Sequence, residues 1–187
     1  MNIEGMVGML EYWDIYDVHR QKQSGILKRG VTVPEGAYHM VVHCCLFNTN
    51  GEMLIQQRQP FKEGWPNLWD ITVGGSALAG ETSQMAMSRE MAEEIGFHYD
   101  FKNKRPHMTI QFEGGFDDIY LLIQDVALDS LQLQPEEVQA VGYASEAQIL
   151  HMIEEGIFIP YYPSFIQMLF AMAKTTHLGM ISKLEEK

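Results

Sequence analysis

Glu90, Glu93 and Glu94 are the residues of this chain whose type and spacing point most directly to chemistry. In a helix they are related as i, i+3 and i+4, so they project from one face within a single turn. Their carboxylates repel one another at that spacing, and no lysine shares their face. The arrangement is stable when a cation lies between them. Mg²⁺ prefers such oxygen ligands and often binds together with substrate phosphates.

The segment around these glutamates has clear helix boundaries. Thr82 or Ser83 can serve as the N-cap, and Gly96 stands where a left-handed C-terminal cap is expected. The face opposite the glutamates should form a buried stripe, consisting of Met85, Ser88, Met91, Ala92 and Ile95. Three glutamates taken alone would also fit a solvated acidic helix in an acidic protein.

The longer pattern from Gly75 to Phe97 favours the metal-binding interpretation. It reads Gly-x5-Glu-x7-Arg-Glu-apolar-x-Glu-Glu-x-Gly-apolar, in which the first fixed glutamate is Glu81 and the arginine is Arg89. Such a set of fixed positions should arise by chance in roughly one chain in a million of this length. The segment resembles the Nudix box, matched without a gap. The resemblance implies an α/β fold in which a mixed β-sheet is sandwiched between helices, and a loop–helix–loop that holds the catalytic metal.

Length and charge limit the remaining possibilities. A chain of 187 residues fits one domain, so we expect a single Nudix domain over residues 1–187. The net charge of −12 argues against a nucleic-acid polymer as partner. No apolar run approaches the roughly 20 residues that span a bilayer. The first residues lack a basic start followed by an apolar block, which favours a cytoplasmic location and no membrane partner.

The apolar run of residues 38–47 contains the two cysteines, Cys44 and Cys45. Adjacent residues of a strand point to opposite faces, so a disulfide between them is not expected. Other strands are predicted over 11–18, 26–31, 52–58, 69–73, 108–113, 118–127 and 138–143, with a turn at 21–25. Helices are predicted over 145–155 and 161–178. This irregular alternation is typical of a mixed sheet covered by helices.

The resemblance extends beyond the box to the isopentenyl-diphosphate isomerase branch of the Nudix superfamily. It rests on the spacing from His39 through Arg58, Lys62 and the tryptophans Trp65 and Trp69. The resemblance implies that Arg58 and Lys62 contact a substrate diphosphate, which suits a bidentate guanidinium and a point charge. The alternative is that both are surface cations. Trp65 and Trp69 could stack on the substrate, or they could simply pack in the core.

Residues that isomerases need for their own chemistry are missing. Gly74 stands where isomerases carry a catalytic cysteine, and Ser76 where they carry a metal-binding histidine. His39 and Asp118 match positions of isomerase metal ligands, but the rest of that set is absent, and His39 fits a structural role at the start of a strand. Moving protons on a carbon skeleton requires positioned acid and base groups, which Gly74 does not supply.

The sequence therefore predicts a Mg²⁺-dependent hydrolase, with Mn²⁺ as an alternative metal, that cleaves the diphosphate linkage of a small nucleoside-diphosphate-type or other organic diphosphate. An isomerase-like enzyme and a non-catalytic nucleotide-binding domain are the alternatives. The metal ligands are expected to be Glu90, Glu93, Glu94 and the carbonyl of Gly75. Arg89 should orient Glu81 or Glu93, and the catalytic set is Glu93, Glu94, Arg89 and Glu81.

Several questions stay open at this stage. An additional base or ligand could come from Asp117, Asp118, Glu136 or Glu137, and the sequence does not choose among them. Residues 1–35 are similar to the N-terminal extension of the isomerase branch and should form a hairpin-like extension. This extension could cover the pocket mouth or lie across a homodimer.

Overall fold

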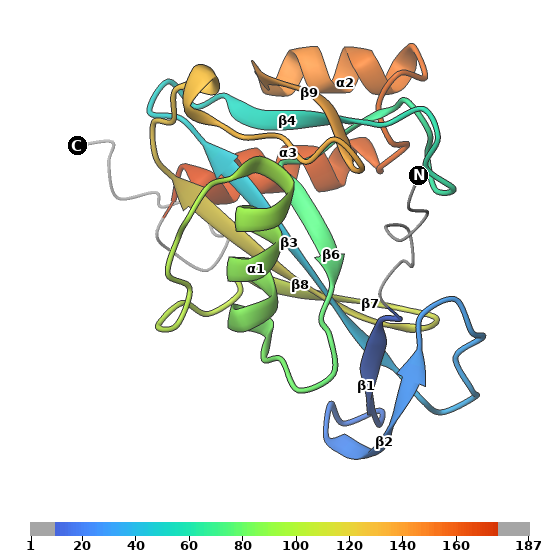
Figure 1. The fold of residues 1–187 in the computed structure, drawn as a ribbon. Helices are drawn as coiled ribbons and strands as arrows, with labels where there is room; N and C mark the ends of the chain where they lie inside the picture. Colours follow the sequence, from blue (N-terminus) through green and yellow to red (C-terminus); the bar gives the residue numbers. More distant parts are fainter. Residues whose placement is uncertain (1–9, 176–187) are drawn as a thin grey trace, which may run out of the picture.

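A mixed β-sheet between helices forms the centre of the molecule (Figure 1). The structure is a computed structural model that describes residues 10–175. The sheet has seven strands in the order β5-β4-β3-β8-β7, while β6 also pairs with β3 and β9 with β4. The strand bounds are β3 His39–Phe47, β4 Met53–Arg58, β5 Trp69–Asp70, β6 Val73–Ser76, β7 Met108–Phe112, β8 Gly115–Ile123 and β9 Val138–Ala144.

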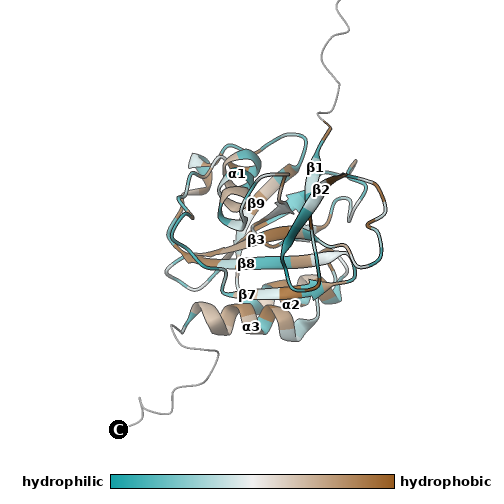
Figure 2. Cartoon of the chain, turned by 90° about the horizontal axis from the view of Figure 1, so that it is seen from below, coloured by the Kyte–Doolittle hydropathy of each residue, from teal (hydrophilic) through white to brown (hydrophobic). Residues whose placement is uncertain are grey.

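Helices cover both faces of this sheet. Helix α1 (Ser83–Ile95) packs on one face, and α2 (Glu146–Glu154) and α3 (Pro163–Ala173) pack on the other. In Figure 2, α3 lies along the sheet beside β7 and β8. A single 3₁₀ turn, η1, covers Leu128–Ser130. The expected α/β sandwich is confirmed.

Strand β3 divides the core in two because successive residues point to opposite faces. Cys44 is buried in the core under α1, and Cys45 is buried in the core under α2 and α3. Both thiols are free. The prediction that the adjacent cysteines form no disulfide is confirmed.

The edge of β3 opposite β8 is shared by two strands. Val41–Cys44 pair with β6, whereas Phe47 pairs with Met53 of β4. Along the other edge, β8 runs parallel to β3 over the whole strand. The sheet thus opens between β6 and β4, and α1 makes contacts to both sides of this opening.

The predicted caps of α1 are confirmed. The Thr82 side chain accepts a hydrogen bond from Met85 N–H, and Gly96 has a left-handed φ of 66°. The predicted buried stripe is wrong at Met85, which is 55% exposed. Glu90 and Glu94 lie instead on the buried face with Met91 and Ile95. The helix is rotated so that these carboxylates face the opening of the sheet.

The N-terminal extension forms a hairpin of β1 (Tyr12–Tyr16) and β2 (Lys22–Lys28). The turn predicted at 21–25 is wrong, because β2 begins at Lys22 and Gly25 lies inside it with a φ of 110°. The chain reverses one step earlier, where Arg20 N–H donates to Asp17 O. Residues 1–9 of the predicted extension lie outside the described residues.

Other predicted boundaries differ by a few residues. The strand predicted over 118–127 begins at Gly115, because parallel pairing with His39 starts there. Helix α3 ends at Ala173, and residues 176–178 of the predicted helix lie outside the described residues. Within residues 10–175, no helix is long and apolar enough to cross a membrane.

Candidate active site

Glu90 occupies a place that only glycine at position 75 permits. A Cβ built on Gly75 would lie 2.1 Å from Glu90 Oε1 and 2.3 Å from its Cδ. The carboxylate therefore packs directly against the backbone of β6, and its side chain is 12% exposed. Burial raises the pKa of Glu90, although the neighbouring Arg89 lowers it. The glycine of the sequence motif is thus a steric requirement of the glutamate fifteen positions later.

Glu94 reaches the opposite side of the sheet opening. Gln56 of β4 donates a hydrogen bond from Nε2 to Glu94 Oε2 at 2.9 Å. Burial, assisted by the nearby charge of Glu90, raises the pKa of Glu94 to about 8. The other amide atom, Gln56 Oε1, is buried and has no hydrogen-bond partner within residues 10–175. Helix α1 therefore presents two buried carboxylates between β6 and β4.

Arg89 is the cation beside the glutamates, and it contacts both of the residues that it was expected to orient. Its guanidinium binds both oxygens of Glu81, at 2.7 and 2.9 Å. It also lies 3.0 Å from Glu90 Oε1 and donates to Glu93 Oε2 at 3.0 Å. A further bond to Ser76 O, at 3.1 Å, ties it to the end of β6. Arg89 thus orients Glu81 and Glu93 together.

The donor set of this site fits a hard divalent cation. Glu90 and Glu94 are buried carboxylates of one helical turn, beside the backbone of Gly75. In residues 10–175, no three His, Cys, Asp or Glu side chains converge as a preformed metal site. Glu93 is 52% exposed and paired with Arg89. Glu93 could join the set only by leaving that ion pair.

Arg58 and Lys62 are already engaged by protein groups. Arg58 Nε donates to Gly64 O at 3.0 Å, and Nη1 lies 3.7 Å from Asp70 Oδ2. Lys62 forms an ion pair with Glu137. Both side chains are about one-fifth exposed, so they are less solvated than surface cations. Glu137, one of the late acidic candidates, therefore serves here as a partner for Lys62, while Glu136 is exposed.

The two tryptophans of the expected pocket lie differently. Trp69 is half-buried and packs against the core under α2 and α3. Trp65 is 51% exposed and has a φ of 51°, in the left-handed region. A bulky residue in that region is strained, and such strain is often found in functional loops. Trp65 is thus available to a ligand, whereas Trp69 is mainly a packing residue.

Asp118 and His39 act structurally and connect the N-terminal hairpin to the sheet. Asp118 is 2% exposed and accepts two bonds from Arg20, at 3.0 and 2.9 Å. His39 stacks on Trp13 with ring centroids 4.2 Å apart, and its Nδ1 bonds to Gly114 O. Burial lowers the pKa of His39. The two residues do not lie together as an isomerase-type metal site.

Asp117 contacts a residue that the sequence analysis did not consider. Its Oδ2 lies 2.8 Å from His43 Nδ1. The His43 ring covers Gly74, since a Cβ built there would lie 2.0 Å from His43 Cδ2. The only sequence signal was strand alternation, which places His43 on the same face of β3 as Cys45.

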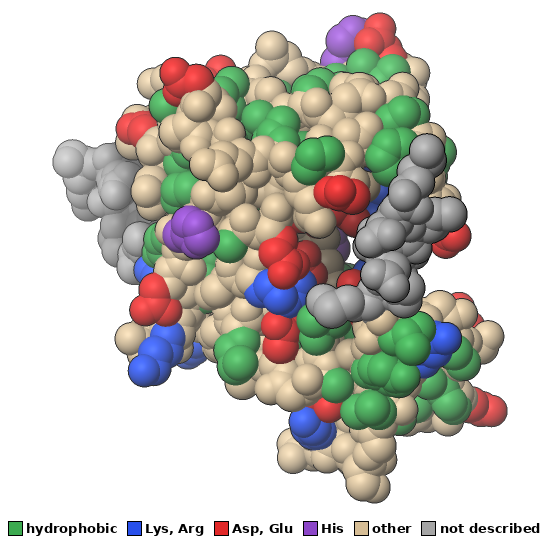
Figure 3. Space-filling view, viewed as in Figure 1, with side chains coloured by type: hydrophobic (Ala, Val, Ile, Leu, Met, Phe, Trp, Pro, Cys, Tyr) green, Lys and Arg blue, Asp and Glu red, His purple; other side chains and the backbone are tan. Residues whose placement is uncertain are grey.

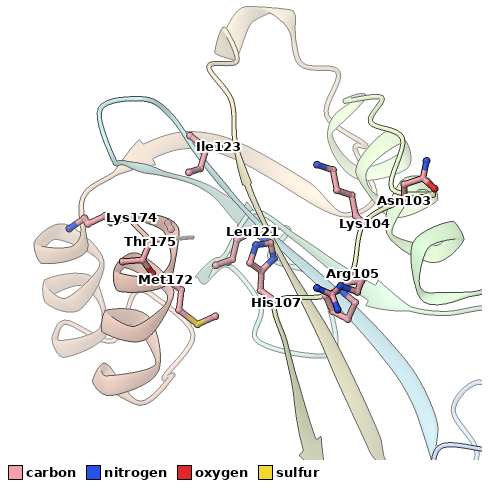
Figure 4. A pocket seen from close by; sticks show the side chains of 11 residues that line it. Asn103, Lys104, Arg105, His107, Leu121, Ile123, Met172, Lys174 and Thr175 are labelled. Atoms are coloured by element: carbon pink, nitrogen blue, oxygen red, sulfur yellow. The ribbon is translucent and has the colours of Figure 1, made fainter. Parts of the chain in front are cut away.

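Charged side chains of both signs gather over α1 near the centre of the face shown in Figure 3. A separate cavity of about 770 Å³ lies between the loop at 103–107 and the end of α3 (Figure 4). It is lined by Lys104, Arg105, His107 and Lys174 among others, and by none of the motif residues. The chemistry-bearing residues of the motif are therefore not in this cavity.

Comparison with known proteins gives a consistent result. A family model described as NUDIX domain matches residues 37–162. An uncharacterized Nudix hydrolase of Listeria innocua is 42% identical over 167 residues, covering 89% of this chain and 98% of that protein. An isopentenyl-diphosphate Delta-isomerase of Corynebacterium diphtheriae is 25% identical, covering 84% and 91%. A crystal structure of a Deinococcus radiodurans protein has a TM-score of 0.70 at 23% identity, covering 84% and 98%, and shows the same fold.

Proposed function

The chain belongs to the Nudix hydrolase family, and we propose that it uses a divalent cation, Mg²⁺ or Mn²⁺, to hydrolyse the diphosphate linkage of a small organic diphosphate. The observation that carries this proposal is the pair of buried carboxylates, Glu90 and Glu94, beside the glycine backbone at Gly75. A buried pair of like charges is costly unless a cation or a proton neutralises it. The carboxylate and carbonyl oxygens are the ligands that these metals prefer.

In this proposal, Glu90, Glu94 and the Gly75 carbonyl hold the cation, and Glu93 completes the set. A bound divalent cation supplies charge neutralisation for the phosphoryl oxygens and a more acidic bound water. Arg89 keeps the carboxylates in place through its bonds to Glu81 and to the end of β6. Such supporting contacts fix the geometry of ligands and influence activity strongly.

Arg58 and Lys62 are proposed to contact the substrate phosphates. Each is paired with one carboxylate, Asp70 and Glu137 respectively, and neither pair is fully buried. The Arg58–Asp70 contact, at 3.7 Å, is longer than a hydrogen bond, and the Lys62–Glu137 pair is partly exposed, so both cations can turn toward a phosphate. Trp65, exposed on the same loop, offers an aromatic face for the organic part of the substrate.

An isomerase function is not favoured by the geometry. The His43 ring fills the space that a side chain at position 74 would need. A cysteine at that position would clash with the ring, so the isomerase arrangement does not fit this chain.

The test is a chromatographic screen for hydrolysis products of nucleoside diphosphates, nucleoside diphosphate-sugars, dinucleoside polyphosphates and isoprenoid diphosphates, with and without Mg²⁺. We expect turnover of at least one class that stops in excess EDTA. Glu94→Gln should reduce kcat by orders of magnitude, whereas the exposed control Glu136→Gln should not change it. Full turnover in excess EDTA would refute the metal-dependent mechanism.

A further inference from the structure

His43 lies next to β6, the strand that carries Gly75 of the proposed metal site, and has a fixed orientation. It is the β3 residue opposite Gly74 of β6, one position before Gly75. Its Nδ1 bonds to Asp117 Oδ2 at 2.8 Å. A carboxylate at this distance holds the proton on Nδ1 and leaves Nε2 as the nitrogen that exchanges protons. That nitrogen lies over Gly74, because a Cβ built there would be 2.2 Å away.

Two hydrogen-bond acceptors lack a partner here, one in the carboxylate bonded to His43 and one in the amide bonded to Glu94. These atoms, Asp117 Oδ1 and Gln56 Oε1, are buried and meet no donor in the part of the chain that the structure describes. Gln56 is only 3% exposed and reaches Glu94 through its other amide atom. Buried acceptors without a partner are rare in native proteins and indicate a missing donor. A water molecule can satisfy them, whereas an anionic phosphate oxygen cannot.

The charge of Glu94 also acts on the His43 imidazole. Burial lowers the pKa of His43, but Asp117 together with Asp70 and Glu94 outweighs this effect and raises it to about 8. The neutral imidazole, which is the form that accepts a proton, therefore gains in population as the pH rises through this value. The charged groups that act on His43 are Asp117 on β8, Asp70 on β5 and Glu94 on α1. Cys45 on β3 is influenced by the same two aspartates, and Arg58 and Tyr161 contact Asp70.

We infer that His43 is the general base of this hydrolase and that Asp117 is its positioning residue, an inference that rests on the proposed function. In the step, the attacking water loses a proton to His43 Nε2 while its oxygen forms a bond to phosphorus. The bridging P–O bond breaks, and its electron pair passes to the oxygen of the leaving phosphate. The imidazolium, stabilised by Asp117, then releases the proton to solvent.

Gly74 has a clear place in this arrangement. With any larger side chain at position 74, the ring could not lie against β6 and bond to Asp117 at the same time. Gly74, at the position where isomerases carry a cysteine, thus leaves the space that the His43 ring fills. The position of the His43 ring therefore depends on glycine at position 74.

The first experiment compares His43→Gln with His39→Gln, a control at a histidine that stacks on Trp13 outside the site. We expect His43→Gln to lower kcat about 10²- to 10⁴-fold with KM changed less than about threefold. The log of kcat/KM in the wild type should rise with pH as the imidazole loses its proton, and His43→Gln should abolish this limb. A raised KM with unchanged kcat would make His43 a phosphate contact and overturn the inference.

The second experiment tests Asp117 as a positioning residue. Because Asp117 raises the pKa of His43, Asp117→Asn should move the ascending limb to lower pH and reduce kcat about 10- to 100-fold. A purely structural role would lower the melting temperature and leave the limb unmoved, which would refute the positioning role.

A third measurement separates this inference from the proposed function. The NMR signal of the His43 ring is followed while Mg²⁺ and methylenediphosphonate, a non-hydrolysable diphosphate, are added to the folded wild type. We expect the His43 signal to shift and the His39 signal to remain. If no diphosphate in the screen is cleaved but the signal shifts, the proposed hydrolysis fails while His43 remains a residue of the ligand site, and its role as base is refuted. An unchanged His43 signal with a bound diphosphonate overturns the inference even if the enzyme is active.

Discussion

Replacing Gly74 by alanine should destabilise the chain through one contact, the ring of His43. The ideal Cβ would lie 2.0 Å from His43 Cδ2, whereas ordinary contacts begin at 3.4 Å. Because the interior is close-packed, the ring must move by roughly 1 Å or more. The bond from His43 Nδ1 to Asp117, 2.8 Å long, does not survive a displacement of this size.

The expected cost follows from these two effects. Overpacking of a filled site costs about 1–3 kcal/mol. Loss of a hydrogen bond to a charged group costs about 1.5–3 kcal/mol. The free energy of unfolding should therefore fall by about 3–5 kcal/mol, which for a domain of this length lowers the melting temperature by about 10 °C.

The assay is reversible denaturation of a double-mutant cycle, and it needs no knowledge of the substrate. His43→Ala removes the ring, so Gly74→Ala should cost far less in the double variant, with a coupling free energy of about 2–3 kcal/mol. Gly142→Ala is the matched control, because nothing lies within 4 Å of a Cβ at that position. Additive losses, or a Gly74→Ala variant as stable as the wild type, would refute the steric reasoning.

Three further outcomes are expected. Arg58→Ala should lower kcat/KM by about 10- to 100-fold. It should also reduce the melting temperature slightly, through loss of the hydrogen bond from Arg58 to the Gly64 carbonyl. Lys62→Ala should have the same effects but smaller ones. A large fall in melting temperature with unchanged kcat/KM would instead mark Arg58 as a structural ion-pair partner. Incubation with isopentenyl diphosphate in heavy water should give no deuterated dimethylallyl product, and its appearance at enzymatic rates would contradict the hydrolase assignment. Asp14→Ala should speed hydrogen exchange at the Gly80 amide, which loses its bond to Asp14 Oδ2. It should also lower kcat, because Glu81 is the residue after Gly80 and would be held less firmly. Unchanged exchange would show that the hairpin does not hold this loop.

The features of α1 that could be predicted are encoded locally. Capping by Thr82 and Gly96 depends on residues within one or two turns of the helix ends. The separation of Cys44 from Cys45 follows from the alternation of any strand. The motif spacing likewise needs only the sequence from Gly75 to Phe97. Each of these signals lies in a short continuous segment.

The rotation of α1 could not be predicted from the segment alone. Periodicity placed the three glutamates opposite a buried stripe, which required Met85 to be buried. Met85 is exposed, because the helix turns Glu90 and Glu94 toward the opening between β6 and β4. That opening is a property of the whole sheet. A helix that carries a site can violate the rule that carboxylates face solvent.

The partners of the late acidic residues depend on pairings over long distances in the chain. Asp117 and Asp118 are neighbours in the sequence, but they lie on opposite faces of β8. One therefore meets His43, 74 positions away, and the other meets Arg20, 98 positions away. The register of β8 against β3 decides both contacts, and no local pattern contains it.

The charges near α1 predict that the proposed cation is needed for substrate binding as well as for hydrolysis. The cations there are already matched by carboxylates, and Glu94 has Gln56 rather than a cation as its hydrogen-bond partner. These matched pairs are Arg58 with Asp70, Lys62 with Glu137, Arg89 with Glu81, Glu90 and Glu93, and His43 with Asp117. An anionic diphosphate that approaches the metal-free chain therefore meets more negative than positive charge, in a protein of net charge −12. If free lysines held the phosphates, the substrate could bind first and await the metal. We therefore expect the proposed metal to bind before the substrate or together with it.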